Sequence, residues 1–592
     1  MNGVGGGVLS EAREWWLGLS NGKRTVAIAF LLAPLFLLLW REGRYLTLLV
    51  LGVPGLWFGF RIGFLRFIDR EARILLLLIA VFLGVGLIGW AVGGFTEEGL
   101  QRFDRHNRLI LFLPWLISLI WLQPPPRLIW LMLAISGFVV ATAGLIEVWQ
   151  AGQGLSHRVE GDAHAMSFAL SCTLLAAVLA GGAWQFRRSP LFAVFLLLAA
   201  VAATLAMLMT GVRAGVLGLI LAFMTLAICF GAFRDRLGLL AFLVAPLGVM
   251  LLIVTFTADG MKERMGQGVG QVQEYLSVEA AMPPRSEARS GCQDDPRLLS
   301  ATLKADAVLQ RRVERLEVVT GEEGAACGSG ARYRIEAGSK RAATVRLPRQ
   351  YLLDADDLDA VVHARGEGAR MTLRDSEPRD VSAETARLVL PSARAHQDHL
   401  EVSLKPGGWV EFTPDAQWPG EYRYPHVVRS MNQRMEMWRV ALAAFAQRPL
   451  LGYGTGSFNE IARAWVNEGR AAPVLLHYDH AHSEYMDALA TRGVLGFLTL
   501  LLLLIALVWV SYRRPSRASK QADIAKCQRG GIPFAAAWVA LSGIFLTEAS
   551  LSMNLNAISI ALFLAIALYL AHRGREPEDW QYNRLSFRKQ KD

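Results

Sequence analysis

Apolar residues in this chain come in long blocks that are separated by short, basic loops. Most blocks hold about 16 to 22 residues, enough for a helix rising about 1.5 Å per residue to cross a hydrocarbon core of about 30 Å. Soluble cores do not need repeated blocks of this length. The pattern predicts an all-α polytopic membrane protein with about twelve transmembrane helices. We expect them near residues 25–40, 45–60, 74–93, 109–122, 128–149, 166–184, 191–209, 215–231, 237–256, 493–511, 532–548 and 557–571.

The loops between these blocks predict the orientation of the chain. Lys and Arg cluster after the second, sixth, eighth and tenth blocks and in the tail, all on one side of a twelve-helix arrangement. The positive-inside rule makes that side cytoplasmic, together with both termini, although Arg41 and Arg44 fall outside. The same count places four segments outside: 94–108, 150–165, 210–214 and 257–492.

Composition agrees with this topology. The chain is 53% hydrophobic and 19% charged, whereas a typical soluble protein is about 25% charged. Its net charge of +10 comes largely from the loop arginines and lysines, so we expect no nucleic-acid partner. The first twenty residues lack a small-residue cleavage site after an apolar stretch, so we expect the first apolar block to stay in the membrane.

Four parts follow along the chain. Residues 1–256 form a membrane domain of about nine helices, and residues 493–571 add about three more. Residues 572–592 are a basic cytoplasmic tail. The loop 257–492 between the membrane parts is large enough for a domain of its own.

Within this loop, residues 265–425 read as an inserted mixed α/β-rich domain, followed by a helical segment over 426–492. Apolar spacing predicts a helix over 297–318. The period then changes over 331–415, which favours short strands and a small sandwich-like β subdomain. We expect the strands near Tyr333, Val345, Val361, Met371, Leu388, Val402 and Val410, with glycine turns at 365–368 and 405–408.

Two features of the inserted domain leave alternatives open. Cys292 and Cys327 form a disulfide if the loop lies outside the cytoplasm, and are otherwise unpaired thiols. A group of aromatic residues either stacks on sugar rings, forms a small core or docks on the membrane. Its members are Trp409, Trp418, Tyr422 and Tyr424.

The most informative chemistry lies just before the tenth block, in His477-Tyr-Asp-His480-Ala-His482-Ser483-Glu484. A zinc-binding site is one interpretation of three histidines so close together. However, His480 and His482 at i,i+2 would point to different sides of a helix, and no suitably spaced further ligand follows. The alternative interpretation is that this segment is a solvated polar linker.

Here the sequence resembles the bacterial O-antigen ligases. His482-Ser483, nine residues and Gly493-x-x-Gly496 match that family's signature. Upstream segments also resemble its patterns, and we quote them in chain order: Arg158-Val-Glu-Gly161, Gly211-Val-Arg213-Ala-Gly215, Arg434-Met-Glu-Met-Trp438 and Pro449-Leu-Leu-Gly452-Tyr-Gly454-Thr-Gly456-Ser-Phe458. Val212 replaces the family's usual serine. The resemblance covers most of the chain except about 265–425.

The resemblance implies a bacterial inner-membrane glycosyltransferase whose catalytic loop, here 426–492, is periplasmic. The donor would be a glycan on undecaprenyl diphosphate, and the acceptor a sugar hydroxyl of lipid A–core or a growing glycan. Arg158, Arg213 and Arg434 would stabilise the departing diphosphate through their planar guanidinium groups. His482 would accept the acceptor's proton in an inverting, metal-independent transfer that needs no cofactor, with His480 assisting.

Other readings remain. Glu484 or Asp479 could orient a histidine, and the glycines 452–456 could bind phosphate, although close backbone packing is preferred. The same superfamily includes repeat-unit polymerases and protein O-oligosaccharyltransferases. A transporter is the main rival of another class, but the spans lack buried charges at mid-membrane and a repeat. A sensor or scaffold would not explain the His and Arg residues.

Overall fold

The structure is a computed structural model of the 592-residue chain. It describes most of the membrane part and separate pieces of the large loop. The described residues are 4–39, 48–62, 70–151, 159, 165–232, 271–273, 275–276, 313–319, 332–337, 343–348, 360–373, 379–381, 386–390, 399–414, 430–467, 470–512, 531–549, 551 and 554–573. Chain contacts divide it into two compact units. Unit 1 comprises 1–267, 441–458 and 480–592, and unit 2 comprises 268–440 and 459–479.

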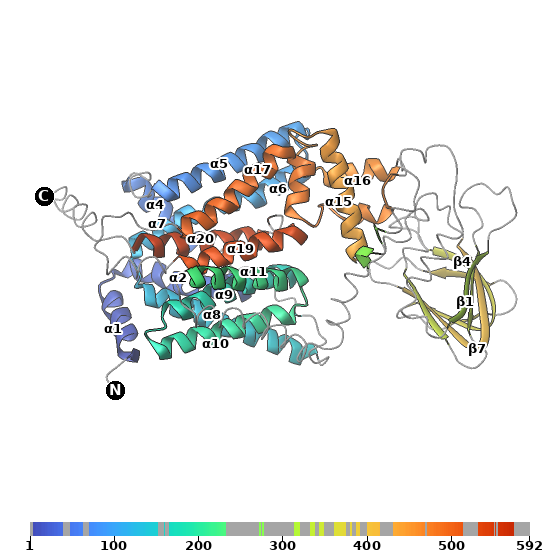
Figure 1. The fold of residues 1–592 in the computed structure, drawn as a ribbon, viewed down its shortest axis with the longest axis horizontal. Helices are drawn as coiled ribbons and strands as arrows, with labels where there is room; N and C mark the ends of the chain where they lie inside the picture. Colours follow the sequence, from blue (N-terminus) through green and yellow to red (C-terminus); the bar gives the residue numbers. More distant parts are fainter. Residues whose placement is uncertain are drawn as a thin grey trace. The chain divides into compact units, whose positions relative to one another are not determined.

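Unit 1 is a bundle of apolar helices (Figure 1). A helix occupies every predicted span except 237–256, which lies outside the described residues. The elements are α1 (Val4–Leu17), α2 (Asn21–Leu39), η1 (Leu48–Gly52), α4 (Val53–Ile62), α5 (Arg70–Val92), α6 (Glu97–Asn107), η3 (Arg108–Leu111), α7 (Phe112–Leu122), α8 (Pro126–Ala151), α9 (Ala165–Gln185), α10 (Pro190–Met209), α11 (Arg213–Ala232), α17 (Glu484–Tyr512), α19 (Ile532–Thr547) and α20 (Asn554–Arg573).

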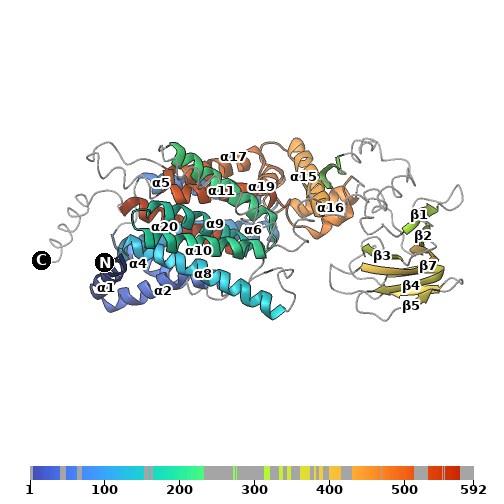
Figure 2. The same ribbon diagram turned by 60° about the horizontal axis from the view of Figure 1, so that its bottom comes forward.

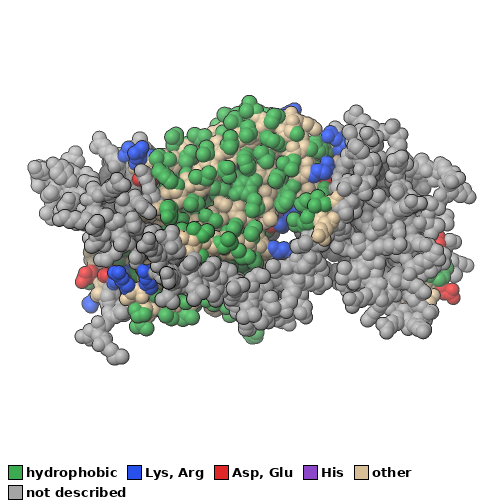
Figure 3. Space-filling model, viewed as in Figure 1, with side chains coloured by type: hydrophobic (Ala, Val, Ile, Leu, Met, Phe, Trp, Pro, Cys, Tyr) green, Lys and Arg blue, Asp and Glu red, His purple; other side chains and the backbone are tan. Residues whose placement is uncertain are grey.

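Five of the described helices are long and apolar enough to cross a membrane: α5, α8, α9, α10 and α17. Shorter apolar helices accompany them, among them Ile532–Thr547. The chain is thus a multi-pass membrane protein, and twelve spans remain a prediction. Figure 3 agrees, because hydrophobic side chains cover much of the described surface in the middle of this bundle, with Lys and Arg toward its two ends.

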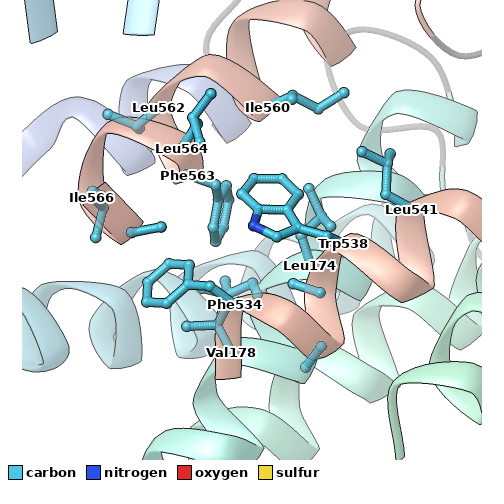
Figure 4. Packing of buried hydrophobic residues seen from close by; sticks show 14 of the residues in the cluster. Leu174, Val178, Phe534, Trp538, Leu541, Ile560, Leu562, Phe563, Leu564 and Ile566 are labelled. Atoms are coloured by element: carbon cyan, nitrogen blue, oxygen red, sulfur yellow. The ribbon is translucent and has the colours of Figure 1, made fainter. Parts of the chain in front are cut away.

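Helix α9 lies at the centre of the bundle, and its apolar segment is completely buried. Its sequence is rich in Ala and Gly, and such small residues allow neighbouring backbones to approach closely. A Cβ on Gly181 would lie 2.8 Å from the Pro533 Cα of α19. Figure 4 shows Leu174 and Val178 of this helix beside Phe534 and Trp538 of α19. This contact fixes α19 against α9.

In the described part of the helix bundle, α1 and α6 have no counterpart among the predicted spans. Helix α6 is strongly amphipathic and begins at an N-cap, where Thr96 accepts a hydrogen bond from the Gly99 backbone N–H at 3.2 Å. Its buried side includes Arg102 and His106. These two residues face the start of α17, so α6 takes part in building the candidate site.

Unit 2 contains a seven-stranded antiparallel sheet (Figure 2). Its strand order is β1-β2-β7-β4-β5, with β3 also paired to β7 and β6 to β4. The bounds are β1 (Val313–Val319), β2 (Arg332–Ala337), β3 (Ala343–Pro348), β4 (Ala360–Leu373), β5 (Arg379–Val381), β6 (Ala386–Leu390) and β7 (His399–Pro414). The part of the chain that was predicted to be β-rich therefore forms a sheet.

Two details of that prediction are wrong. Residues 313–319, expected at the end of a helix, form β1 and pair with β2, because hydrogen bonding to a distant strand overrides a weak local period. The glycine segments expected as turns also lie inside the long strands β4 and β7. Gly368 and Gly407 have φ of +66° and +69°, and the β4–β7 register shifts between Glu367 and Ala369. These glycines accommodate an irregularity in the ladder instead of reversing the chain.

Unit 2 also holds helical elements: α15 (Ser430–Gln447, shared with unit 1), α16 (Phe458–Asn467, likewise) and η9 (Pro473–His477). The fully buried Glu436 carboxylate ties these parts together. It accepts hydrogen bonds from the Tyr275 hydroxyl at 2.8 Å, from the Arg439 guanidinium at 2.8 Å and from the Ala472 N–H at 3.2 Å. Cys292 and Cys327 lie outside the described residues, so their disulfide remains a prediction.

Candidate functional site

His482 occupies the turn immediately before α17. Its backbone has φ of +47°, a left-handed conformation that is uncommon for a residue with a side chain. Its N–H donates to Nδ1 of His480 at 3.1 Å, and the two rings meet edge to face with centroids 4.4 Å apart. Because Nδ1 of His480 accepts this bond, His480 supports the backbone of His482. The structure brings these two predicted residues together.

The next residue, Ser483, starts α17 and attaches it to α19. Its Oγ accepts from the Met486 N–H at 3.4 Å, as an N-cap side chain does, and donates to the Phe545 carbonyl at 3.2 Å. Tyr485 adds a second link by donating its hydroxyl to the Ser542 carbonyl at 3.1 Å. The start of α17 is therefore fixed to the last turns of α19.

A carboxylate outside the sequence motif faces His482. Glu548 follows the last residue of α19, and its Oε2 lies 3.5 Å from Nδ1 of His482. The Glu548 side chain is 4% exposed and the His482 side chain 21%. The sequence suggested Glu484 or Asp479 for this role. Glu484 instead faces His106 in α6, and Asp479 belongs to unit 2 and is exposed.

The first turns of α17 contain a buried charged cluster shared with α6. Arg102 lies 3.3 Å from Asp487, and both side chains are at most 4% exposed. Glu484 lies 3.6 Å from the His106 ring and 3.8 Å from the Arg492 guanidinium. Such a cluster is stable only when each charge has a partner of opposite sign. It therefore fixes α6 beside the turn that carries His482.

His106 contributes to this cluster as a neutral ring. Burial lowers the pKa of the His106 imidazole to about 4, although the Glu484 carboxylate acts in the opposite direction. At neutral pH the positive charge nearest Glu484 is therefore that of Arg492. The Arg492 guanidinium also lies over the Phe82 ring at 5.0 Å, and within the described structure none of its nitrogens has a hydrogen-bond partner.

We expect Arg102→Ala to destabilise the protein by about 3–5 kcal/mol, because it leaves the buried Asp487 carboxylate without its guanidinium partner. Arg108→Ala is the matched control. It breaks an i,i+4 pair with the 59%-exposed Asp104, and such pairs contribute roughly 0.5 kcal/mol or less. Thermal unfolding midpoints in detergent would measure both. Equal midpoints for the two variants would contradict the structural role of the cluster.

The glycine-rich segment 449–456 packs against this helix start. Gly452 has φ of +67°, and a Cβ there would lie 2.5 Å from the Thr491 carbonyl carbon. Gly454 and Gly456 approach the backbones of Gly93 and Gly99 in the same way. The Gly454 N–H donates to the Thr491 carbonyl at 2.8 Å. The preferred interpretation, close backbone packing, is confirmed.

The signature glycines of α17 have local roles. Gly493 has φ of +62° and ψ of −160°, values almost restricted to glycine, and it kinks the helix where the sequence predicted that the apolar span begins. A Cβ at Gly493 would lie 2.5 Å from the backbone of Leu450. One at Gly496 would lie 2.2 Å from Cβ of Arg492, so Gly496 leaves room for that side chain.

Arg213 is the first residue of α11 and is exposed. The turn before it contains Gly211 with φ of +65°. Helices α11 and α19 run side by side (Figure 1), and a Cβ on Gly218 would lie 3.0 Å from Ile544. The hairpins α9–α10–α11 and the Gly181–Pro533 contact make these two helices antiparallel. Arg213 therefore begins α11 at the end of the bundle where α19 reaches Glu548.

The other two predicted arginines are Arg434 and Arg158. Arg434 lies on α15 in unit 2, is half-buried and is near Tyr478. Burial raises the pKa of the Tyr478 phenol, and the charge of Arg434 partly offsets this effect. Arg158 lies outside the described residues, whereas the adjacent Val159 N–H donates to the Met209 carbonyl at 3.1 Å. The roles of both arginines remain predictions.

Sequence reasoning missed Glu548, Arg102 and His106. The spacing of Arg102 and His106 at i,i+4 on an amphipathic segment was a usable signal for a polar face, but not for its partner. Within the residues that the structure describes, no three His, Cys, Asp or Glu side chains gather as metal ligands would. Trp409 lies half-buried on β7, and the other three aromatic candidates lie outside the described residues.

Comparison with known proteins identifies the segment around His482. Residues 426–501 match the family model described as O-antigen ligase. An uncharacterized protein of Haemophilus influenzae is 29% identical over 76 residues, which are 13% of this chain and 19% of that protein. The chain thus matches only about a fifth of that relative's length. The family match is also narrower than the motif resemblance and does not include Arg158 or Arg213. Its range contains His480, His482, Gly493 and Gly496, so this chain carries an O-antigen ligase domain over residues 426–501.

Proposed function

We propose that this protein is an O-antigen ligase, a glycosyltransferase that moves a glycan from undecaprenyl diphosphate to a sugar hydroxyl of lipid A–core at the periplasmic face of the inner membrane. The observation that carries this proposal is the O-antigen ligase match over 426–501, which includes His482. The family implies lipid-linked glycan substrates in general. The apolar helices of unit 1 place the protein in the bilayer, which also holds the lipid part of such a substrate.

The donor end of the reaction needs positive charge. Negative charge grows on the diphosphate as the bond between its oxygen and the anomeric carbon breaks, and fixed guanidinium groups stabilise that charge. Arg213 supports this assignment because it is exposed at the N-terminus of α11, where the helix dipole adds partial positive charge. We assign Arg434 and Arg158 to the same diphosphate.

The acceptor end needs a base, because a sugar hydroxyl is a poor nucleophile at neutral pH. His482 takes the hydroxyl proton as the acceptor oxygen attacks the anomeric carbon. A new glycosidic bond forms, the diphosphate leaves with the bonding electron pair, and the anomeric configuration inverts. The partial exposure of the His482 ring, 21% of the side chain, supports access by an acceptor.

A deletion strain tests the acceptor. An O-antigen ligase deletion leaves finished polymer on the lipid carrier and lipid A–core without polymer. Single repeat units on lipid A–core would instead indicate a polymerase, and loss of glycan from a protein would indicate a protein O-oligosaccharyltransferase. An unchanged glycan pattern in the deletion strain would contradict all three. Complementation with the wild-type chain is the control.

We expect transfer to be independent of divalent metal ions, since the proton moves to an imidazole and guanidinium groups offset the phosphate charge. Transfer by the purified protein in liposomes should therefore be the same before and after treatment with EDTA. A second sample with Zn²⁺ added back is the control. Strong inhibition by EDTA that Zn²⁺ reverses would favour the zinc interpretation of the histidine segment instead.

A further inference from the structure

Glu548 lies where a histidine base requires a carboxylate. Its Oε2 is 3.5 Å from Nδ1 of His482, an ion-pair distance longer than an ordinary hydrogen bond, and that nitrogen is buried. The Glu548 side chain is nearly buried as well, at 4% exposure. The imidazole therefore presents one nitrogen to a protein carboxylate and leaves Nε2 as the nitrogen on the other side of the ring.

The protein fixes this pair from both sides. The Glu548 side is held by the Leu551 N–H, which donates to Oε2 of Glu484 at 3.1 Å. The His482 side is held by its neighbours Ser483 and Tyr485, which donate to carbonyls of α19. Three consecutive residues after His482 thus bond to the segment that carries Glu548. These hydrogen bonds hold the two segments that carry His482 and Glu548 next to each other.

The backbone of His482 is held in the same way. The N–H of Ala481 donates to Oδ1 of Asp487 at 3.4 Å, and the N–H of His482 donates to His480. These bonds stabilise the left-handed conformation at His482. A strained residue persists only where its surroundings over-determine it, and such residues gather at functional sites. The conformation directs the ring toward Glu548.

We infer that Glu548 is a positioning residue for His482, an inference that rests on the proposed glycan transfer. Its carboxylate accepts the proton that Nδ1 of the neutral ring carries, and so fixes the tautomer in which Nε2 is unprotonated. When the acceptor hydroxyl gives its proton to Nε2, the ring becomes an imidazolium and Glu548 stabilises that charge without taking the proton. A carboxylate that orients a catalytic histidine acts in this way in unrelated enzymes.

The experiment compares Glu548→Gln and Glu548→Asp with wild type in proteoliposomes that contain a lipid-linked glycan donor and a lipid A–core acceptor. We expect Glu548→Gln to lower kcat by about 10²- to 10⁴-fold with little change in KM, and Glu548→Asp to recover part of it. Glu548 and His480 both contact the His482 ring.

Two control variants separate the possible outcomes. Glu98→Gln, an exposed carboxylate on α6, should be silent. His482→Ala combined with Glu548→Gln should be no slower than His482→Ala alone, because the two residues act as one unit. A purely structural role of Glu548 would lower kcat together with the unfolding midpoint. That result, or full activity of Glu548→Gln, would overturn the inference.

A readout without turnover separates this inference from the proposed function. Diethyl pyrocarbonate modifies neutral imidazole nitrogens, and peptide mass spectrometry locates the product. Glu548→Gln should slow modification of His482 severalfold and leave that of the exposed His477 unchanged. Equal rates at His482 in both proteins would refute the positioning role even if transfer is observed. If the rates differ but wild type transfers no glycan, the proposed function fails while the pairing of Glu548 with His482 survives.

Discussion

Replacing His482 by alanine should lower glycan transfer by about 10³-fold, because general base catalysis by a positioned histidine contributes roughly 10²- to 10⁴-fold. The acceptor hydroxyl would then have no group to take its proton as it attacks. The variant should still insert into the membrane, since the ring is partly exposed and lies outside the apolar core. Transfer by purified protein in liposomes would measure the loss.

Two further variants make this result specific. Alanine at φ of +47° strains the backbone, whereas asparagine tolerates that conformation better and is no base. His482→Asn should therefore be as inactive as His482→Ala, with an unfolding midpoint closer to wild type. His477→Ala, at an exposed histidine of the same segment, is the control and should retain activity. Normal transfer by His482→Asn would rule out the base assignment.

Arg213→Ala should weaken use of the donor by on the order of 10²-fold in kcat/KM, because a fixed guanidinium no longer meets the diphosphate. Arg213→Lys should recover only part of that loss. Lysine keeps the positive charge but lacks the planar fork that pairs with two phosphate oxygens. The rate as a function of donor concentration would separate the effect on binding from the effect on the chemical step.

The control for this variant is an arginine at the opposite end of the bundle. Arg187 follows the last turn of α9, is exposed and stacks over Trp184 at 4.4 Å. Arg187→Ala should leave donor use unchanged. Full activity of Arg213→Lys would show that charge alone suffices and that paired hydrogen bonds to phosphate are not needed. Full activity of Arg213→Ala would remove this residue from the site.

The sequence by itself determined the helical membrane part and the position of the candidate base. Membrane helices follow from local composition, because a long run of apolar residues has no other stable arrangement in lipid than a helix with all backbone groups paired. These features depend on residues close together in the chain, so one sequence contains the whole signal.

The sequence by itself did not determine the strand pairing or the long-range charge contacts. Residues 313–319 look helical by period but pair with β2, and the glycines at 368 and 407 interrupt long strands instead of ending them. The partners of a strand lie elsewhere in the chain, and its own pattern does not name them. For the same reason a short apolar segment cannot be assigned from periodicity alone.

Only the tertiary structure decided what surrounds His482. Helices α17 and α19 separate Glu548 from His482 in the chain, and Arg102 contacts Asp487 across 385 residues. In the sequence each of these is a single charged residue, with nothing to indicate its partner. Burial then selects the pairing, because two opposite charges removed from water are stable together and costly apart. The motif therefore located the candidate base, and the packing of α6 and α19 against α17 supplied the groups that surround it.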